Sequence, residues 1–596
     1  MKGRFVMVIL CFALAIMDSD WEAHSLEGRD VEALLSWRKA MTFDPNGSLS
    51  SWVSNNSKNL YQWNGISCRP HTKRVVSIIL SELGLEGTIT PSLGGLSLLH
   101  TLNLSDNRFT GRIPPKLGDL KSLRILDLND NLLLGSIPAS LSNCTQLFLI
   151  TLSENNLTGN IPSEFGMLTE LVHLSLARNK LSGSIPDSIG NLRNLKTIFL
   201  HNNNLTGPIS PMLGNCSQLN IIRLCDNNLT GNIPSEFGML TKLVHLRLAR
   251  NKLSGSIPQG IGNLRKLETL SLHTNNLTGT ISPILGKCSS LKSIRSSSNS
   301  LSGSLPASLT NCTKLELFDF RKNGLTGELP SYLANFHRMR VLSLGYNKLE
   351  GKLGAWITNL TKLQVLDLSN NQLGGRIPSN LERLSGFGIN GAPSLSGSTL
   401  YQDLTIVMKG KEYTIDYVLQ ANTILDLSSN NLSGNIPGCL GSLSSLRLLN
   451  LSKNQLEGKI PPSLGKIWTL EQLDLSENKL SGRIPEELSK LSLLASVNFS
   501  GNELCGAVPS GPQFDTFNQT SFQRNLCLCG SPLQRCEQQN THPTPSTPTE
   551  TEDDSIWSVV DEHVSLIALS LGFSIGFGGV LYVIMGRGCF LKQLNS

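Results

Sequence analysis

Leucines and one asparagine recur at a fixed spacing of about 24 residues through most of the chain, a kind of period that indicates repeated coils. The segment Leu102–Asn107 has the pattern L-x-L-x-x-N, which returns at Leu126–Asn131 and at the same interval up to Leu366–Asn371. It resumes at Leu425–Asn430 and continues to Asn502. Alternating leucines predict a short strand with one apolar face. This pattern and period are typical of a solenoid of leucine-rich coils.

One complete unit reads L-x-x-L-x-L-x-x-N-x-L-x-G-x-I-P. The asparagine is expected to be buried, so its amide must be hydrogen-bonded, and stacked coils would supply backbone partners. Glycine permits the turn, and proline stops a helix from forming. No coil buries its leucines alone. We therefore predict an α/β solenoid of about 17 coils, thirteen before residue 384 and four after about residue 420, with Leu83 replacing the asparagine in the first coil.

Two apolar runs lie at the ends of the chain. Residues 1–25 combine a basic start with an apolar stretch from Phe5 to Met17, which predicts a secretory signal peptide. Residues 564–585 carry no charge and are long enough to span a bilayer. Acidic residues precede this span, and Arg587 and Lys592 follow it, so the preceding part is expected outside the cell. These features predict a single-pass type I protein of the plasma membrane; a cleaved lipid-anchor signal is the alternative.

The period with Gly-x-Ile-Pro resembles the plant-specific class of leucine-rich repeats over roughly residues 75–510. In that class the N-terminal cap carries cysteines just before a tryptophan, and here Leu60 and Tyr61 stand in that place, so Cys68 lacks its expected partner. At the other end we expect a Cys529–Cys536 disulfide, with Cys505 and Cys527 as the candidate second pair. Four cysteines replace a core leucine of the repeat and are expected to be small buried side chains: Cys144, Cys216, Cys288 and Cys312.

The period breaks between residues 384 and 422. Asn430 follows Asn371 at well over twice the repeat interval, so a segment longer than one coil is inserted between them. The inserted segment begins rich in glycine and serine and then alternates in character from Leu404 to Tyr413, which predicts two strands turning at Gly410. A disordered insertion is the alternative.

These features together divide the chain into a series of segments. The boundaries are a signal peptide (1–25), an N-terminal cap (26–74), a first repeat block (75–384), an insertion (385–421), a second repeat block (422–510), a C-terminal cap (511–540), an acidic juxtamembrane segment (541–563), a transmembrane helix (564–585) and a short cytoplasmic tail (586–596).

The insertion before the last four coils, the Met-Lys-Gly-Lys-Glu-Tyr stretch at residues 408–413, the acidic collar, the single span and the short tail resemble plant receptor-like proteins, above all the xylanase-receptor branch of disease-resistance proteins. The resemblance implies an ectodomain that senses microbial molecules or peptides and signals through adaptor and co-receptor kinases. The implied adaptor contact is the small-residue face Ala568, Gly572 and Gly576, whose spacing lets a second helix approach closely.

Outward positions of the strands would line a concave sheet, and in the middle of the chain they are largely basic. The candidate ligand-binding residues are Phe199, His201, Arg223, His245, Arg247, Arg250, His273, Arg295, Arg321 and Lys322. A cationic stripe favours an acidic peptide, a free carboxylate or an acidic glycan. Histidines that gain charge near about pH 6 would strengthen such binding in an acidic cell wall. The alternative is that these side chains are simply solvated.

Glycan acceptor sequences of the form Asn-x-Ser/Thr are frequent, as a secreted protein permits. We expect glycans at Asn46, Asn103, Asn156, Asn204, Asn276, Asn359, Asn450 and Asn518. Those at Asn103 and Asn450, together with one at Asn498, would block the concave sheet near both ends and leave its middle clear.

The net charge of +6 is too small to indicate nucleic-acid binding. No catalytic triad, metal motif or phosphate loop stands out, so we expect neither an enzyme nor a cofactor or metal site, and the tail has no kinase motif. The main hypothesis is a kinase-less receptor for a peptide or elicitor protein in plant defence. The alternatives are a developmental peptide co-receptor, or an inhibitor of microbial wall-degrading enzymes, which would need no membrane span.

Overall fold

The computed structural model describes residues 23–53, 60–388, 404–408, 411–415 and 423–536. The chain divides into two units, residues 1–536 and 537–596, and the fold described below belongs to the first. The predicted signal peptide, apart from residues 23–25, and the predicted membrane span and tail lie outside the described residues. None of the helices in the described ranges is long and apolar enough to cross a membrane.

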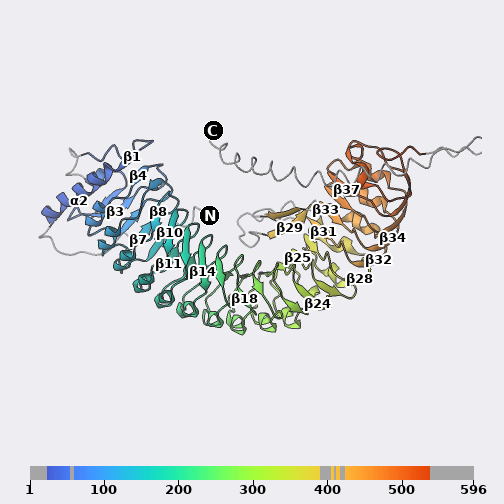
Figure 1. Cartoon of the computed structure of the whole chain (residues 1–596), viewed down its shortest axis with the longest axis horizontal. Coiled ribbons are helices and arrows are strands. Elements are labelled where there is room, and N and C mark those ends of the chain that lie inside the picture. Colours follow the sequence, from blue (N-terminus) through green and yellow to red (C-terminus); the bar gives the residue numbers. More distant parts are fainter. Residues whose placement is uncertain (1–22, 54–59, 389–403, 409–410, 416–422, 537–596) are drawn as a thin grey trace, which may run out of the picture. The chain divides into compact units, whose positions relative to one another are not determined.

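A long parallel sheet runs through the first unit, and consecutive coils each contribute one strand to it (Figure 1). Within the described residues, thirteen such strands precede the insertion and four follow it. They are β3 (Val75–Ile79), β5 (Thr101–Asn103), β7 (Ile125–Asp127), β9 (Leu149–Thr151), β11 (His173–Ser175), β13 (Thr197–Phe199), β15 (Ile221–Arg223), β17 (His245–Arg247), β19 (Thr269–Ser271), β21 (Ser293–Arg295), β23 (Leu317–Asp319), β25 (Val341–Ser343), β27 (Val365–Asp367), β31 (Ile424–Asp426), β33 (Leu448–Asn450), β35 (Gln472–Asp474) and β37 (Ser496–Asn498).

Each coil continues from its main strand into a short strand on the flank and then into a short 3-10 helix. The 3-10 helices, such as η5 (Ala139–Asn143), η10 (Gln259–Asn263) and η14 (Ala355–Asn359), lie along the outer side of the curved stack, opposite the main sheet (Figure 1). The flank strands are β4 (Glu86–Thr88), β6 (Arg108–Thr110), β8 (Leu134–Ser136), β10 (Asn156–Asn160), β12 (Lys180–Gly183), β14 (Asn204–Pro208), β16 (Asn228–Thr230), β18 (Ser254–Gly255), β20 (Asn276–Leu277), β22 (Ser302–Gly303), β24 (Gly324–Glu328), β26 (Lys348–Glu350), β28 (Gly374–Arg376), β32 (Asn431–Asn435), β34 (Gln455–Lys459), β36 (Lys479–Gly482) and β38 (Glu503–Ala507).

The repeat leucines form one continuous core between the main sheet and the outer turns. Leu126 and Leu128, for example, are fully buried, and their equivalents in the other coils belong to the same cluster. Burial of a leucine side chain contributes roughly 1.5–3 kcal/mol. The predicted leucine-rich solenoid is confirmed as a fold.

The repeat asparagine joins each coil to the preceding one. The side chain of Asn131 accepts a hydrogen bond from the Phe109 backbone N–H (2.9 Å) and donates to the Leu104 carbonyl (3.0 Å), both in the preceding coil. It also donates to the Leu128 carbonyl of its own coil (3.3 Å). The same set of bonds recurs at the later repeat asparagines, so the predicted ladder of side-chain amides is present.

The insertion leaves this ladder unbroken. Asn430 accepts from the Leu373 N–H (3.0 Å) and donates to the Leu368 carbonyl (2.9 Å), although these partners precede it by 57 and 62 residues. Strand β31 accordingly pairs directly with β27. Within the insertion, β29 (Leu404–Met408) and β30 (Lys411–Ile415) pair antiparallel, as the predicted strand pair requires.

The N-terminal cap consists of α2 (Ala23–Arg38), β1 (Met41–Phe43) and β2 (Ile66–Cys68), which pairs antiparallel with β3. Cys68, at the end of β2, is half-buried. The cap is packed around the buried rings of Trp37, Trp52 and Trp63, whose successive centroids lie 5.7 and 5.6 Å apart.

A buried ion pair joins the cap helix to the first coil. The Arg74 guanidinium donates to both carboxylate oxygens of Asp30 (2.8 and 3.0 Å), and the Val75 N–H donates to the same carboxylate (2.9 Å). Asp30 is fully buried and Arg74 is 4% exposed. Paired in this way, neither charge is left without a partner in the interior.

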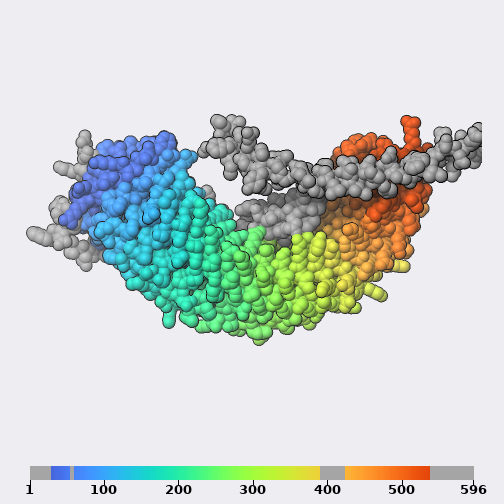
Figure 2. Space-filling model, viewed as in Figure 1, coloured from blue at the N-terminus to red at the C-terminus, as the bar shows by residue number. Residues whose placement is uncertain are grey.

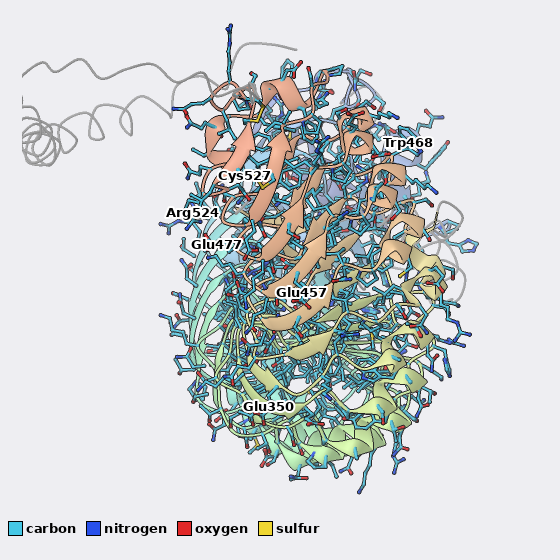
Figure 3. The ribbon with its side chains drawn as sticks, turned by 90° about the vertical axis from the view of Figure 1, so that its right-hand side faces the viewer. Glu350, Glu457, Trp468, Glu477, Arg524 and Cys527 are labelled. Carbon is cyan, nitrogen blue, oxygen red and sulfur yellow. A yellow bond between two sulfur atoms is a disulfide. The ribbon has the colours of Figure 1, made fainter. Side chains whose placement is uncertain are left out.

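The C-terminal cap contains two disulfides, Cys505–Cys527 and Cys529–Cys536, which are the two pairs expected from the sequence. Its strand β39 (Cys527–Cys529) extends the flank sheet beyond β38. Arg524 of this cap forms an ion pair with Glu477 of the preceding coils, on the flank visible in Figure 3. The four cysteines at the core leucine position are fully buried, and burial raises the pKa of the Cys144 thiol to about 11.

Substitution of Asp30 by Asn should loosen the N-terminal cap, because the buried Arg74 charge would lose its counterion. Removing one partner of a buried pair costs roughly 3–5 kcal/mol. Amide hydrogen exchange in β2 and β3 should then accelerate. The matched control is Glu86→Gln, whose exposed pair with Arg108 should contribute at most about 1 kcal/mol. Equal exchange rates in the two variants would contradict a stabilising role for the Asp30–Arg74 pair.

Candidate functional site on the inner face

The last residue of every main strand points outward, and these residues form one column along the inner face of the sheet. We call it the central column. In the strands from β13 to β37 it consists of Phe199, Arg223, Arg247, Ser271, Arg295, Asp319, Ser343, Asp367, Asp426, Asn450, Asp474 and Asn498, each paired in register with the next. Neighbouring strands lie about 4.8 Å apart. The surface of the unit is hollowed along this side (Figure 2).

The structure brings the predicted basic residues onto this face. Phe199, Arg223, Arg247 and Arg295 belong to the central column, and His245 begins strand β17. His201, His273 and Arg321 follow two residues after their strands, in a parallel column. Arg250 and Lys322 come next, at the strand exits, where the backbone has a positive φ in every coil (51° and 54°). We call the part-exposed members of β13 to β17 and their exits the basic stripe: Phe199, His201, Arg223, His245, Arg247 and Arg250.

The expectation of one uniform cationic stripe over six coils is wrong for its C-terminal members. Arg295 and Arg321 are only 4% and 5% exposed. Arg295 Nε lies 4.0 Å from a carboxylate oxygen of Asp319, and Arg321 Nε lies 3.3 Å from one of Asp367. Their charges are therefore balanced within the sheet. In the basic stripe Arg250 is likewise paired, with Asp226 (3.3 Å), and Arg223 and Arg247 are the part-exposed arginines of its central column.

Two of these arginines, Arg223 and Arg321, each lie against an aromatic ring. The Arg223 guanidinium lies 5.1 Å from the centre of the Phe199 ring, and that of Arg321 lies 4.8 Å from the centre of the Tyr346 ring. Cation–π contacts of this kind contribute about 0.5–2 kcal/mol. Arg223 is part-exposed beside its ring, whereas Arg321 is almost fully buried.

The expected gain of histidine charge near about pH 6 is wrong for His245 and His273. Burial, reinforced by Arg247, lowers the pKa of His245 to about 4. Burial and the neighbouring Arg295 lower the pKa of His273 well below its usual range. The imidazoles of His245 and His273 are therefore neutral in a mildly acidic wall and add no positive charge to the inner face there.

Sequence reasoning missed the acidic half of the central column. Asp319, Asp367, Asp426 and Asp474 occupy the same outward position as the arginines. The signal was visible in the repeat itself, since the residue between the two strand leucines of Leu-Asp-Leu must point outward. Burial, and then the adjacent Asp367, raise the pKa of Asp426 to about 7.

The candidate glycan acceptors fall into two groups. Asn46, Asn156, Asn204, Asn276, Asn359 and Asn518 are exposed. Asn103 is 9% exposed and its side-chain oxygen accepts from the Ser105 N–H (3.0 Å), and a glycan there stays a prediction. Asn450 is half-buried and donates to Asp426 (3.4 Å). The predicted helix-packing residues Ala568, Gly572 and Gly576 lie outside the described residues.

Known proteins share this architecture. The N-terminal leucine-rich-repeat domain model matches residues 27–69, and leucine-rich-repeat models match residues 217–277 and eight single units between 98 and 491. The crystal structure of a TDR receptor is 32% identical, over 75% of this chain and 80% of that chain, with a TM-score of 0.56. The chain belongs to the plant leucine-rich-repeat receptor family.

Other members of the family show the same likeness. The ectodomain of the Arabidopsis receptor kinase HAESA, solved with the peptide hormone IDA and the co-receptor SERK1, is 30% identical over 84% of this receptor and 98% of that chain, with a TM-score of 0.50. Receptor kinase-like protein Xa21 of Oryza sativa subsp. japonica is 40% identical over 82 residues, 13% of this chain. The kinase EFR of Arabidopsis thaliana is 38% identical over 81 residues, also 13% of this chain. The match spans 8% of the length of each of these two relatives.

The raised pKa of Asp426 predicts a pH dependence of stability. Between about pH 4 and pH 7 the folded receptor keeps a proton that the unfolded chain releases, so the free energy of unfolding falls as the pH rises. Asp426→Asn should remove this part of the slope, on the order of 4 kcal/mol over the whole range. Melting of the full chain across that pH range measures it. Glu457→Gln on the flank (Figure 3) is the control, and an unchanged slope in Asp426→Asn would refute the assignment.

Proposed function

We propose that this receptor is a kinase-less, cell-surface receptor-like protein. It binds an extracellular peptide or elicitor protein on the inner face of its repeats and signals through partner receptor kinases in plant defence. The observation that carries the proposal is the basic stripe, in which Arg223 and Arg247 stand side by side in register beside the Phe199 ring. An acidic ligand group would meet two neighbouring guanidinium groups there.

The likeness to solved receptors supports a peptide as the ligand class. The HAESA structure contains a peptide hormone and a co-receptor kinase, and this chain spans nearly all of that ectodomain. That likeness favours a second candidate function, a developmental peptide co-receptor with the same inner-face site. Defence and development differ in the ligand, not in the chemistry of the face that receives it.

Exchange of both Arg223 and Arg247 for Gln should weaken ligand capture about tenfold or more, because each charge-assisted hydrogen bond contributes about 1.5–3 kcal/mol. Full-length tagged receptor in plant membranes, treated with elicitor fractions, is assayed for ligand-dependent recovery of kinases. Arg265→Gln, an exposed arginine that follows η10 on the outer side, is the matched control. Unaltered ligand dependence in the double variant would refute the stripe as the binding surface.

Association with the kinases is tested separately in the membrane span. Replacing Gly572 and Gly576 by Leu should lower kinase recovery several-fold even without ligand, because bulky side chains prevent close helix approach. Ser570→Leu with Ser574→Leu places the same bulk on the opposite face of a helix and should leave recovery unchanged. If both pairs of substitutions behave alike, the small-residue face is not the contact.

A further inference from the structure

A hollow of about 330 Å³ lies on the inner face C-terminal to the basic stripe. Its lining comes from strands β25, β27, β31, β33, β35 and β37 and from the residues that follow them. The Tyr346 ring, 41% exposed, and the Lys453 side chain stand among the lining residues at the strand exits. Asp367, Asp426 and Asp474 of the central column also line it. The hollow is therefore polar, and carboxylates belong to its lining.

Only some of the carboxylates in and beside this hollow have a positively charged partner. Asp319, just outside it, and Asp367 lie beside Arg295 and Arg321 respectively. Asp426 has only neutral partners: it accepts from the Ser428 hydroxyl (2.6 Å), the Ser428 N–H (3.0 Å) and the Asn450 amide (3.4 Å). Asp474 likewise accepts from the Ser476 hydroxyl (2.6 Å) and N–H (3.0 Å). No ion pair among the described residues joins a cation to Asp426 or Asp474.

Neighbouring carboxylates without a cation raise the electrostatic free energy of the hollow. Asp367 and Asp426 are register partners on adjacent strands, about 4.8 Å apart at the backbone. A largely buried carboxylate beside another carboxylate is unfavourable unless a proton or a cation compensates it, and above about pH 7 the proton is lost and a cation is the remaining compensation. The charged residues that line the hollow together with Asp426 are Asp367, Arg321, Asp474 and Lys453. Lys453 lies at a strand exit and forms no ion pair with Asp426 among the described residues.

The chemistry of the lining selects the kind of cation. No group of three His, Cys, Asp or Glu side chains in the described ranges could hold a metal ion. The lining instead offers hydroxyl and amide groups around single carboxylates and one aromatic ring, which suits a guanidinium or ammonium group with several N–H donors. The Tyr346 ring already contacts the Arg321 guanidinium (4.8 Å) and lies 6.0 Å from Lys322 Nζ, so the carboxylates, and not the ring, would attract a further cation.

We propose that this hollow binds a cationic side chain or amino terminus of the ligand, while an acidic group of the same ligand lies on Arg223 and Arg247. This proposal rests on the proposed function and adds the direction in which the ligand lies along the sheet. Six strand steps separate β17 from β31, or about 29 Å, which an extended peptide covers in about nine residues. The ligand is therefore an extended peptide whose acidic and basic groups are separated by that length of chain.

Three decapeptides, acetylated, amidated and labelled with a neutral dye, test this spacing. The first has Asp at one end, Arg at the other and alternating Gly and Ser between; the second has Gln for Arg; the third has Asn for Asp. Fluorescence anisotropy with the full-length receptor in detergent measures their dissociation constants. We expect the first peptide to bind at least about fivefold more tightly than the second, as one charge-assisted contact of about 1 kcal/mol or more requires.

The receptor variants identify where that preference arises. In Asp426→Asn with Asp474→Asn the first two peptides should bind equally, and the isosteric change removes an unbalanced charge, so folding should survive. Glu350→Gln with Glu457→Gln, on the flank (Figure 3), is the matched control and should keep the preference. In the wild type the preference should shrink from about pH 7.5 to about pH 5.5, because protonated Asp426 no longer attracts the cation.

The outcomes separate the two proposals. An Arg preference that is absent in the wild type, or that persists in the Asp426/Asp474 double variant, overturns the hollow as the cation site. If the Arg preference depends on Asp426 and Asp474 but the third peptide binds as well as the first, the hollow stands and the basic stripe fails. If only the Asp end matters, the stripe stands and the hollow fails.

Discussion

The bond on which this structure depends is the one from each repeat asparagine to the backbone of the preceding coil. A chain that turns repeatedly within every coil leaves backbone N–H and C=O groups without partners inside the stack, and such groups must be satisfied. The Asn131 amide satisfies one N–H and two carbonyls at once. Each net bond contributes only about 0.5–1.5 kcal/mol, but an unsatisfied buried group would cost about 1–3 kcal/mol. Leucine burial provides the driving force, and the asparagine specifies which coil lies on which.

Because the ladder fixes the stacking, it also fixes the chemistry of the inner face. Asn430 attaches its coil to the coil of Leu368 and Leu373 as if the insertion were absent. Asp367 and Asp426, which the insertion separates in sequence, thereby become register neighbours. The central column is consequently a line of side chains at constant spacing, and its charge pattern follows from one residue in each coil.

The repeat architecture, both disulfides of the C-terminal cap and the strand pair of the insertion could be predicted because each depends on local patterns of residue type. Properties that depend on neighbouring coils could not. His245 and Arg295 have the residue types of a basic surface, yet burial keeps one neutral and Asp319 balances the other. In the core, Ser296 occupies a leucine position of the repeat, and Phe320 stands at the same position of the next coil, fully buried. A small residue and a large one in adjacent coils can fill a volume that neither position explains alone.

The asparagine ladder itself extends further than the repeat pattern shows. Asn525, in the C-terminal cap, accepts from the Leu504 N–H (3.0 Å) and donates to the Phe499 carbonyl (2.9 Å), so the cap closes the stack with the same bond as the coils. It lies slightly closer to Asn502 than the repeat period requires, and its segment lacks the strand leucines. The asparagine bond to the preceding coil is therefore present even where the leucine pattern of the repeat is lost.

Along the central column the charged residues change from arginine to aspartate. A contribution to folding stability does not by itself account for this change. Burying an ion pair contributes little net free energy, because desolvation offsets the attraction. The pairs of Arg295 with Asp319 and of Arg321 with Asp367 lie where the basic part of the column meets the acidic part. There they cancel each other's fields and leave two surfaces of opposite sign on either side. A rigid sheet with a neutral middle and two charged ends discriminates between ligands by the distance between their charges as well as by their sign. That form of selectivity is available to a solenoid because its coils cannot slide past one another.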